Sequence, residues 1–150
     1  MPKRSMLCAN TVEKRRSYSE LIEIPTIKER FEYLKIGGKI GDATFGSKRI
    51  MNQLLYHSDK WRKRRDKIII RDNGCEMAFP DHEILYMLTV HHLNPITLED
   101  VLEERDCVFD PENLVCVSGD LHKAIHYASD YEFETLVERK PFDTCPWREV

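Results

Sequence analysis

The stretch that decides the fold is LTVHHLNPIT at residues 88–97, followed by DPENLVCVS at 110–118 and GDLHKAIHY at 119–127. Residues 84–92 are a mixed apolar run rich in strand formers, closed by Asn94-Pro95, which predicts a strand. Leu114 to Val117 is a second short apolar run, placed to pair antiparallel with the first. A helix is expected from Ser118 or Gly119 to about Ala128. The sequence therefore predicts a β-hairpin crossed by a helix.

Four of the six histidines fall within this part of the chain. His122 and His126 are four residues apart on the expected helix, which places both rings on one face and suits two ligands of one divalent ion. His91 and His92 are neighbours on a strand and so point to opposite faces, which favours one ligand and one base. Each pair alone is more typical of ordinary surface or core histidines. Their coincidence on elements that pack together favours a site.

These segments resemble the HNH nuclease motif, and the His-His opening with the His-x-x-x-His close is most similar to the nuclease colicins. The wider chain, from about Tyr18 to Tyr127, is similar to small phage-encoded HNH proteins, and the resemblance covers roughly three quarters of the sequence. The supporting segments are RFEYL at 30–34, TFG at 44–46, NQ at 52–53, RDNGC at 71–75 and DTCPW at 143–147. The resemblance implies an α+β protein with a ββα-metal (HNH) core, preceded by N-terminal helices.

Carried over by position, the resemblance implies that His91, His122 and His126 bind one divalent metal ion (Mg, Mn, Zn or Ni). It implies that His92 is the general base and that Asn113 holds the loop and orients His92 through hydrogen bonds. An unperturbed histidine titrates near pH 6.5, so activity is expected to fall steeply below about pH 6. The chain lacks the cysteine pairs that brace many HNH domains with a structural zinc, so its own core must hold the fold.

The charge is divided between the two halves of the chain. Residues 1–75 hold 18 Lys and Arg against 9 Asp and Glu (+9), and residues 76–150 hold 5 against 17 (−12), which gives the net −3. Ser58 is expected to cap a helix that runs to about Arg71, with Trp61 as its core anchor. The basic side chains of this segment are Lys60, Arg62, Lys63, Arg64, Arg65, Lys67 and Arg71. We expect them to contact the phosphate backbone of double-stranded DNA with little sequence specificity, although a solvated charged face explains most such runs.

The chain divides into four expected regions: a basic flexible arm at 1–17, a helical DNA-contacting region at 18–74, the HNH core at 75–128, and a tail at 129–150 that is acidic and then extended. No apolar run approaches the roughly 20 residues of a membrane span. The expected location is the cytoplasm, that of the host cell if the protein is phage encoded. The five cysteines form no Cys-x-x-Cys pair and are expected to be reduced.

The predicted function is a metal-dependent endonuclease that hydrolyses DNA phosphodiester bonds. The resemblance to phage proteins implies a role in phage DNA processing or packaging, with a terminase or packaging protein as partner. Two alternatives remain. One is a non-catalytic, metal-stabilised DNA-binding module, in which His91, His122 and His126 are structural ligands and His92 is incidental. The other is an RNA nuclease that uses the same site. Three histidines leave a coordination position open, which favours catalysis.

Overall fold

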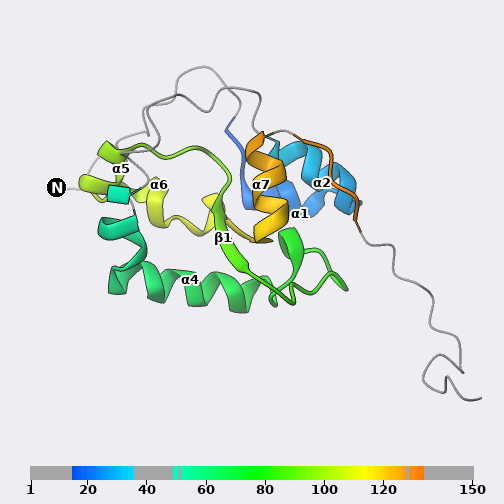
Figure 1. The fold of residues 1–150 in the computed structure, drawn as a ribbon, viewed down its shortest axis with the longest axis horizontal. Helices are drawn as coiled ribbons and strands as arrows, with labels where there is room; N and C mark the ends of the chain where they lie inside the picture. The colour runs from blue at the N-terminus through cyan, green and yellow to red at the C-terminus, as the bar shows by residue number, and fades with distance from the viewer. Residues whose placement is uncertain (1–14, 36–48, 51, 128, 134–150) are drawn as a thin grey trace, which may run out of the picture.

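The structure, a computed structural model, describes residues 15–35, 49–50, 52–127 and 129–133, so most of the predicted arm and tail lie outside it. The described part is a mixed α+β fold, as predicted (Figure 1). The elements in chain order are α1 (Tyr18–Glu23), α2 (Ile27–Leu34), the π-helix η1 (Asn52–Tyr56), α4 (Asp59–Arg71), the 3-10 helix η2 (Glu76–Ala78), β1 (Leu88–His92), α5 (Leu98–Leu102), α6 (Asp106–Phe109), the 3-10 helix η3 (Pro111–Asn113), β2 (Leu114–Ser118) and α7 (Gly119–Tyr127).

β1 and β2 form the predicted antiparallel hairpin. Leu88 lies opposite Ser118 at one end of the ladder, and His92 lies opposite Leu114 at the other. β1 begins four residues later than the apolar run predicted. The reason is Met87, whose φ of 51° is left-handed and interrupts the extended backbone before Leu88.

Both faces of this hairpin are buried by helices. On one face, Val115 and Val117 join a core with residues of α1, α2 and α7. On the other face, Leu114 and Cys116 join a second core with residues of α4, α5 and α6. Figure 1 shows α4 running along one side of the hairpin, while α7 and the N-terminal helices lie on the other. The buried residues of β2 therefore alternate between the two cores along the strand.

Three helices begin at side-chain caps, and the one at Ser58 is the predicted start of α4. The hydroxyls of Thr26, Ser58 and Thr97 accept hydrogen bonds from the backbone N–H groups three residues later, and Thr97 completes a capping box with Asp100. The acidic helix that Thr97 caps is short and ends at Leu102. Glu104, with φ of 48°, turns the chain into the separate helix α6, which the sequence pattern did not predict.

The N-terminal helices are fixed to the hairpin by a buried arginine. Arg30 is 6% exposed, and its guanidinium donates to the carbonyl oxygens of Ile22, Ile24 and Met77 at 2.8–3.0 Å. These bonds pair the buried guanidinium with backbone oxygens at the C-terminal end of α1 and in η2. Arg30 therefore holds α1, α2 and η2 as one unit against the β1–β2 hairpin.

The cysteines differ in part from expectation. Cys75 and Cys116 are buried free thiols, as expected, and burial raises the pKa of Cys116 well above its usual value. Cys107 is disulfide-bonded, so the expectation of a reduced cysteine is wrong there. Spacing along the sequence carries no information on cysteines that tertiary structure brings together. Across the described ranges, no helix has both the length and the apolar character needed to cross a membrane.

An ion pair joins the end of α4 to the second strand. The Asp72 carboxylate is 3% exposed and accepts hydrogen bonds from the Cys116 backbone N–H at 2.8 Å and from Arg71 Nε at 2.7 Å. The Arg71 guanidinium also donates to the carbonyl oxygens of Pro111 and Leu114. These bonds fix α4 against β2, and with it the helix face that carries Trp61.

We predict that Asp72→Ala destabilises the protein by about 3 kcal/mol or more, because removing one partner of a buried pair leaves the other charge and a backbone donor unsatisfied. Urea denaturation followed by circular dichroism measures this loss. Asp66→Ala is the control on the same helix, because its side chain is 70% exposed, and it should change stability by less than about 0.5 kcal/mol. Equal, small effects of both substitutions would contradict the anchoring role of Asp72.

Candidate metal centre and nucleic-acid interface

Three imidazoles from two elements meet on the α7 side of the hairpin. His91 comes from the end of β1, and His122 and His126 come from successive turns of α7. One ring nitrogen from each lies within 4.8 Å of the other two. The His91 ring centroid is 5.1 Å from that of His122 and 5.3 Å from that of His126. The structure therefore brings together the three residues that the sequence motif proposed as ligands.

The spacing of these nitrogens fits a shared ion. His122 Nε2 and His126 Nε2 are 3.0 Å apart. Two imidazoles on one tetrahedral zinc, with bonds of about 2.0–2.1 Å, have their nitrogens roughly 3.3 Å apart. A hydrogen bond between the two rings has a similar distance, so the pair alone does not distinguish the two arrangements.

His91 supplies the observation that does favour an ion. The residue is 3% exposed, and its Nε2 is buried without a hydrogen-bond partner among the described residues. A buried polar nitrogen without a partner is costly, at about 1–3 kcal/mol, unless something else satisfies it. A divalent cation between the three rings would provide that partner. The donor set of the triad thus fits a metal site with three histidine ligands and an open position.

The electrostatics of the triad keep the buried imidazole neutral. Burial lowers the pKa of His91 well below its usual value, and the nearby rings of His122 and His126 lower it further. Metal ligation requires the unprotonated imidazole, so the fold holds His91 in the ligating form across the neutral pH range.

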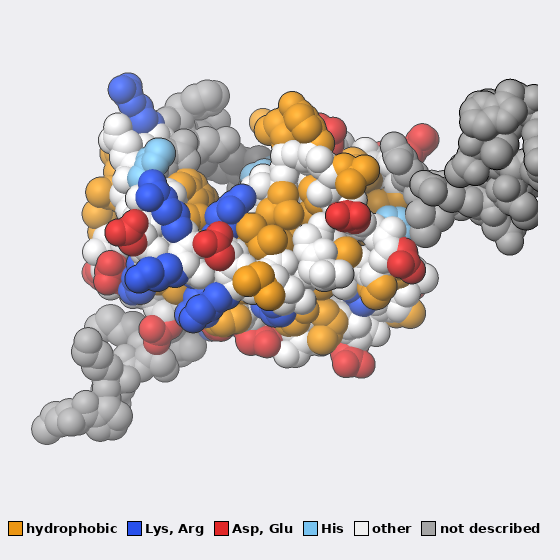
Figure 2. Space-filling view, turned by 90° about the horizontal axis from the view of Figure 1, so that it is seen from below, with side chains coloured by type: hydrophobic (Ala, Val, Ile, Leu, Met, Phe, Trp, Pro, Cys, Tyr) orange, Lys and Arg blue, Asp and Glu red, His pale blue; other side chains and the backbone are white. Residues whose placement is uncertain are grey.

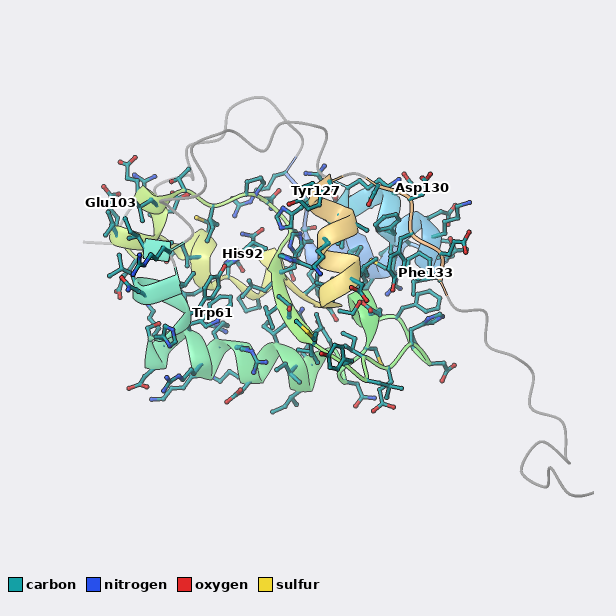
Figure 3. All side chains as sticks on the ribbon, in the orientation of Figure 1. Trp61, His92, Glu103, Tyr127, Asp130 and Phe133 are labelled. Carbon is teal, nitrogen blue, oxygen red and sulfur yellow. The ribbon has the colours of Figure 1, made fainter. Side chains whose placement is uncertain are left out.

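His92 lies on the opposite face of β1, toward α4. Its ring stacks on the Trp61 indole with centroids 5.3 Å apart and an angle of 22° between the planes. Figure 3 labels the two residues between β1 and α4. Its Nε2 is 2.9 Å from the carbonyl oxygen of Val108. A carbonyl only accepts, so Nε2 must carry the proton, and Nδ1 then carries the lone pair. The stack and the hydrogen bond fix both the orientation of the ring and its tautomer.

Burial also lowers the pKa of His92, to about 4. The expectation that activity falls below about pH 6 assumed an unperturbed imidazole. With the shifted pKa, the ring in the free protein stays unprotonated to a lower pH. Burial against Trp61 and Val108 is the physical cause, and no signal in the sequence gives its magnitude.

Asn113 holds the loop that follows the first strand. Its Oδ1 accepts hydrogen bonds from the backbone N–H and the side chain of Asn94, at 2.9 and 2.8 Å. Its Nδ2 donates to the carbonyl oxygen of Cys107 at 2.8 Å. The direct hydrogen bond of His92 is to the carbonyl oxygen of Val108, the residue that follows Cys107. Asn113 therefore acts on His92 only through the peptide that joins Cys107 to Val108. The loop-holding role matches the expectation, and the orienting role is indirect.

The basic side chains of α4 do not all face one way. Lys60, Lys63, Arg64 and Lys67 recur at helical spacing and line a cleft of about 170 Å³ with Phe109. Arg62 and Arg65 lie on other sides of the helix, with Asp59 and Asp66 near them. Figure 2 shows Lys and Arg side chains gathered on the part of the surface where α4 runs, with Asp and Glu among them. All seven predicted cations thus remain at least partly exposed, and the side chains of six of them form no hydrogen bond with a backbone atom that the structure describes.

Arg71 is the exception. Its guanidinium is engaged with Asp72 and two backbone carbonyls, and it lies 3.5 Å from the centroid of the Tyr18 ring. A guanidinium held by these contacts stabilises the fold. The phosphate contacts predicted for the basic helix therefore fall to the other six residues.

Arg16 is a residue near the site that the sequence analysis missed. Its backbone N–H and carbonyl pair with the Asn94 side chain, and its guanidinium donates to the carbonyl oxygens of Tyr33 and Lys35. The end of the expected flexible arm is therefore tied to the loop beside the histidines. The composition of this segment predicted a flexible arm. Its contacts are mainly with backbone atoms far away in the sequence, and composition gives no sign of such contacts.

No family model, no curated protein and no solved structure matches this chain. Membership of the HNH family stays a prediction that rests on the motif. The candidate site rests on geometry within this chain.

We predict that the chain binds one Ni²⁺ or Zn²⁺ ion and that His91→Ala weakens binding by at least about 100-fold, since it removes a direct ligand rather than an outer hydrogen-bond partner, whose loss typically costs about 10–100-fold. Competition with a chromophoric chelator measures the affinity and the stoichiometry. His57→Ala is the matched control, because His57 is an exposed histidine outside the triad. Equal affinities of the two variants would exclude the triad as the metal site.

The pKa of His92 also predicts how stability depends on pH. In the unfolded chain His92 titrates near pH 6.5, and in the folded chain near pH 4, so the unfolded state binds the proton first. The stability contributed by neutral His92 is fully present above about pH 6.5 and is lost as the pH falls toward 4. His91 acts in the same direction. For metal-free protein, His92 should account for a loss of about 2 kcal/mol between pH 7.5 and pH 5.

Urea denaturation in the presence of a chelator at both pH values measures this loss. His92→Gln removes the titrating group and should make the difference between the two pH values smaller by about the same amount. A variant with the same pH dependence as the parent chain would show that His92 is not held neutral by burial.

Proposed function

We propose that this chain is a metal-dependent endonuclease that hydrolyses phosphodiester bonds of double-stranded DNA with low sequence specificity. The observation that carries the proposal is the division of labour at the end of β1. His91 faces two histidines of α7 and brings a buried nitrogen without a described partner, while His92 faces the other way with its tautomer fixed. A ligand set and a separate base are the two parts that metal-assisted hydrolysis of a phosphodiester needs.

The basic helix supports a polyanionic substrate. α4 carries six partly exposed cations besides Arg71, and its Trp61 touches His92 directly. A phosphate backbone bound along α4 is thereby held close to the proposed base. Contacts of this kind do not read bases, which is the reason for expecting low sequence specificity.

In the proposed reaction, the imidazoles of His91, His122 and His126 hold one divalent ion in their neutral forms. When bound, the ion would supply positive charge to the scissile phosphate and to the departing 3′ oxygen. His92 Nδ1 accepts a proton from a water molecule as the water oxygen forms a bond to phosphorus. The bond from phosphorus to the 3′ oxygen then breaks, and the departing oxygen takes up a proton from solvent water. The products are a 5′-phosphate and a 3′-hydroxyl, and His92 returns its proton to solvent.

The low pKa of His92 bears on this role. A base with a pKa of about 4 is unprotonated at neutral pH, but it takes up a proton only weakly. A phosphodiester anion beside the ring stabilises the imidazolium and raises its pKa toward neutrality. Substrate binding would therefore strengthen the base at the point where it is needed, and the Val108 carbonyl stabilises the charged ring further.

A structural metal site is the second candidate, and the burial of His91 favours it. Structural zinc sites are usually closed by four ligands, often including cysteine. Among the described residues the group contains three histidines and no cysteine, and His122 and His126 are only half-buried. An open position with a partly exposed side suits a reacting water and phosphate better than a closed structural site.

We predict that metal-stripped protein cleaves supercoiled plasmid only after a divalent ion is added back, with Mg²⁺, Mn²⁺, Ni²⁺ and Zn²⁺ tested separately. His92→Ala should lower the rate by about 10²–10⁴-fold, the usual contribution of a general base, while metal affinity stays near that of the parent chain. His57→Ala should cleave normally. Agarose gel electrophoresis of nicked and linear products gives the rates.

An absence of cleavage with every ion, despite metal and DNA binding, would overturn the proposal in favour of the structural module. Cleavage of an RNA hairpin at a rate well above that of duplex DNA would instead assign the same site to RNA.

A further inference from the structure

A cleft of about 220 Å³ lies between η1, α4 and β1, and Trp61, which stacks on the proposed base, forms part of its wall. Its lining residues are Tyr56, Trp61, Arg65, Leu88, Thr89 and Val90. Val90 and His92 are two residues apart on β1 and so share a face of the strand. Trp61 lines the cleft and also stacks on His92. A group bound in the cleft would therefore contact Trp61, the residue that stacks on His92.

The walls of the cleft combine aromatic, aliphatic and cationic groups. The Tyr56 and Trp61 rings meet edge to face with centroids 5.4 Å apart, and Leu88 and Val90 supply aliphatic surface. Arg65 adds a guanidinium that is 40% exposed, and its nearest acidic partner, Asp66, is 3.9 Å away in a loose contact. The arginine is therefore free to bind an anion at the mouth of the cleft.

The contacts that Tyr56 makes within the fold explain its position only in part. It is 38% exposed, although it packs against Trp61. Its hydroxyl forms no hydrogen bond with any other residue that the structure describes. A tyrosine placed beside a tryptophan and an arginine at a surface cleft is the combination that binds planar, anionic ligands in single-stranded nucleic-acid sites.

The volume of the cleft limits the size of the ligand that it can hold. Pockets for drug-sized molecules measure about 300–1,000 Å³, so this one takes about one planar ring system. The cleft is too small to hold a base pair. A single base turned out of its stack, with its phosphate on a cation, fits both the volume and the chemistry.

We propose that the cleft of Tyr56, Trp61 and Arg65 is a subsite for one unstacked nucleotide of the substrate strand, next to the bond that is cleaved. The base packs against Tyr56 and the aliphatic wall, and Arg65 binds the phosphate. This inference rests on the proposed nuclease function and adds a substrate feature to it. The enzyme then prefers DNA that opens easily, such as mismatched, single-stranded or flexible pyrimidine–purine sites.

The test uses full-length protein in a chelator, so that binding is measured without cleavage. The probe is a fluorescein-labelled thymidine hexanucleotide, with fluorescence anisotropy as the readout at near-physiological salt. Tyr56→Ala should weaken binding by at least about fivefold, because stacking of one base on an aromatic ring contributes that much or more. Tyr56→Phe keeps the ring and should bind within about threefold of the parent chain.

The matched pair for the charge is Arg65→Gln and Arg62→Gln. Both arginines lie on α4, but Arg62 does not line the cleft. The inference predicts a clearly larger loss for Arg65→Gln and, in the Tyr56→Ala/Arg65→Gln double variant, a loss that is not the sum of the two, since both contact one nucleotide. Thermal midpoints of all variants show whether folding is preserved, and Tyr56→Leu replaces Tyr56→Ala if it is not.

Equal losses for the two arginine variants, with unchanged binding for Tyr56→Ala or its replacement, would overturn the subsite and leave only general attraction to phosphate. Failure of the parent chain to bind the hexanucleotide would also overturn it. Neither outcome depends on cleavage. A chain that binds as predicted but never cuts plasmid would contradict the proposed nuclease and leave the nucleotide subsite standing.

Discussion

The arrangement of the site depends on one constraint, which is that the β1–β2 hairpin is buried on both faces. Alternation along a strand then sends consecutive side chains into different cores. His91, opposite Val115, enters the core that contains α7, and His92, opposite Leu114, enters the core that contains α4. Two adjacent histidines are thereby separated into a candidate ligand and a candidate base without any loop to position them.

The same burial sets the chemistry of both rings. Removal from water lowers the pKa of each imidazole, so the free protein holds them neutral. For His91 this is the ligating form. For His92, the hydrogen bond to Val108 and the stack on Trp61 leave Nδ1 as the nitrogen that accepts a proton. Packing from α4 thus reaches the proposed base directly, which links the basic helix to the chemistry.

The sequence was informative where local rules apply. Strand patterning and helical spacing predicted the hairpin, α7 and the pairing of His122 with His126, and Ser58 predicted a helix start. The choice of His91 over His92 as the third member of the triad came from the motif resemblance. It could not show what depends on backbone atoms far away, such as the Val108 carbonyl that holds His92 or the docking of Arg16 on Asn94. Arg71 looked like its basic neighbours, because the carbonyls that bind it carry no sequence signature. The low pKa of His92 could not be predicted from the sequence either, because it is caused by burial in the folded chain.

The central claim is that imidazoles from β1 and α7 share one ion. X-ray absorption spectroscopy of the protein loaded with one equivalent of Ni²⁺ or Zn²⁺ tests it most directly, because multiple scattering from imidazole rings reports how many histidines are bound. We expect three imidazole ligands, with oxygen in the remaining positions and no sulfur, and the loss of one imidazole in His126→Ala. Sulfur ligands, or at most one imidazole in the parent chain, would contradict it.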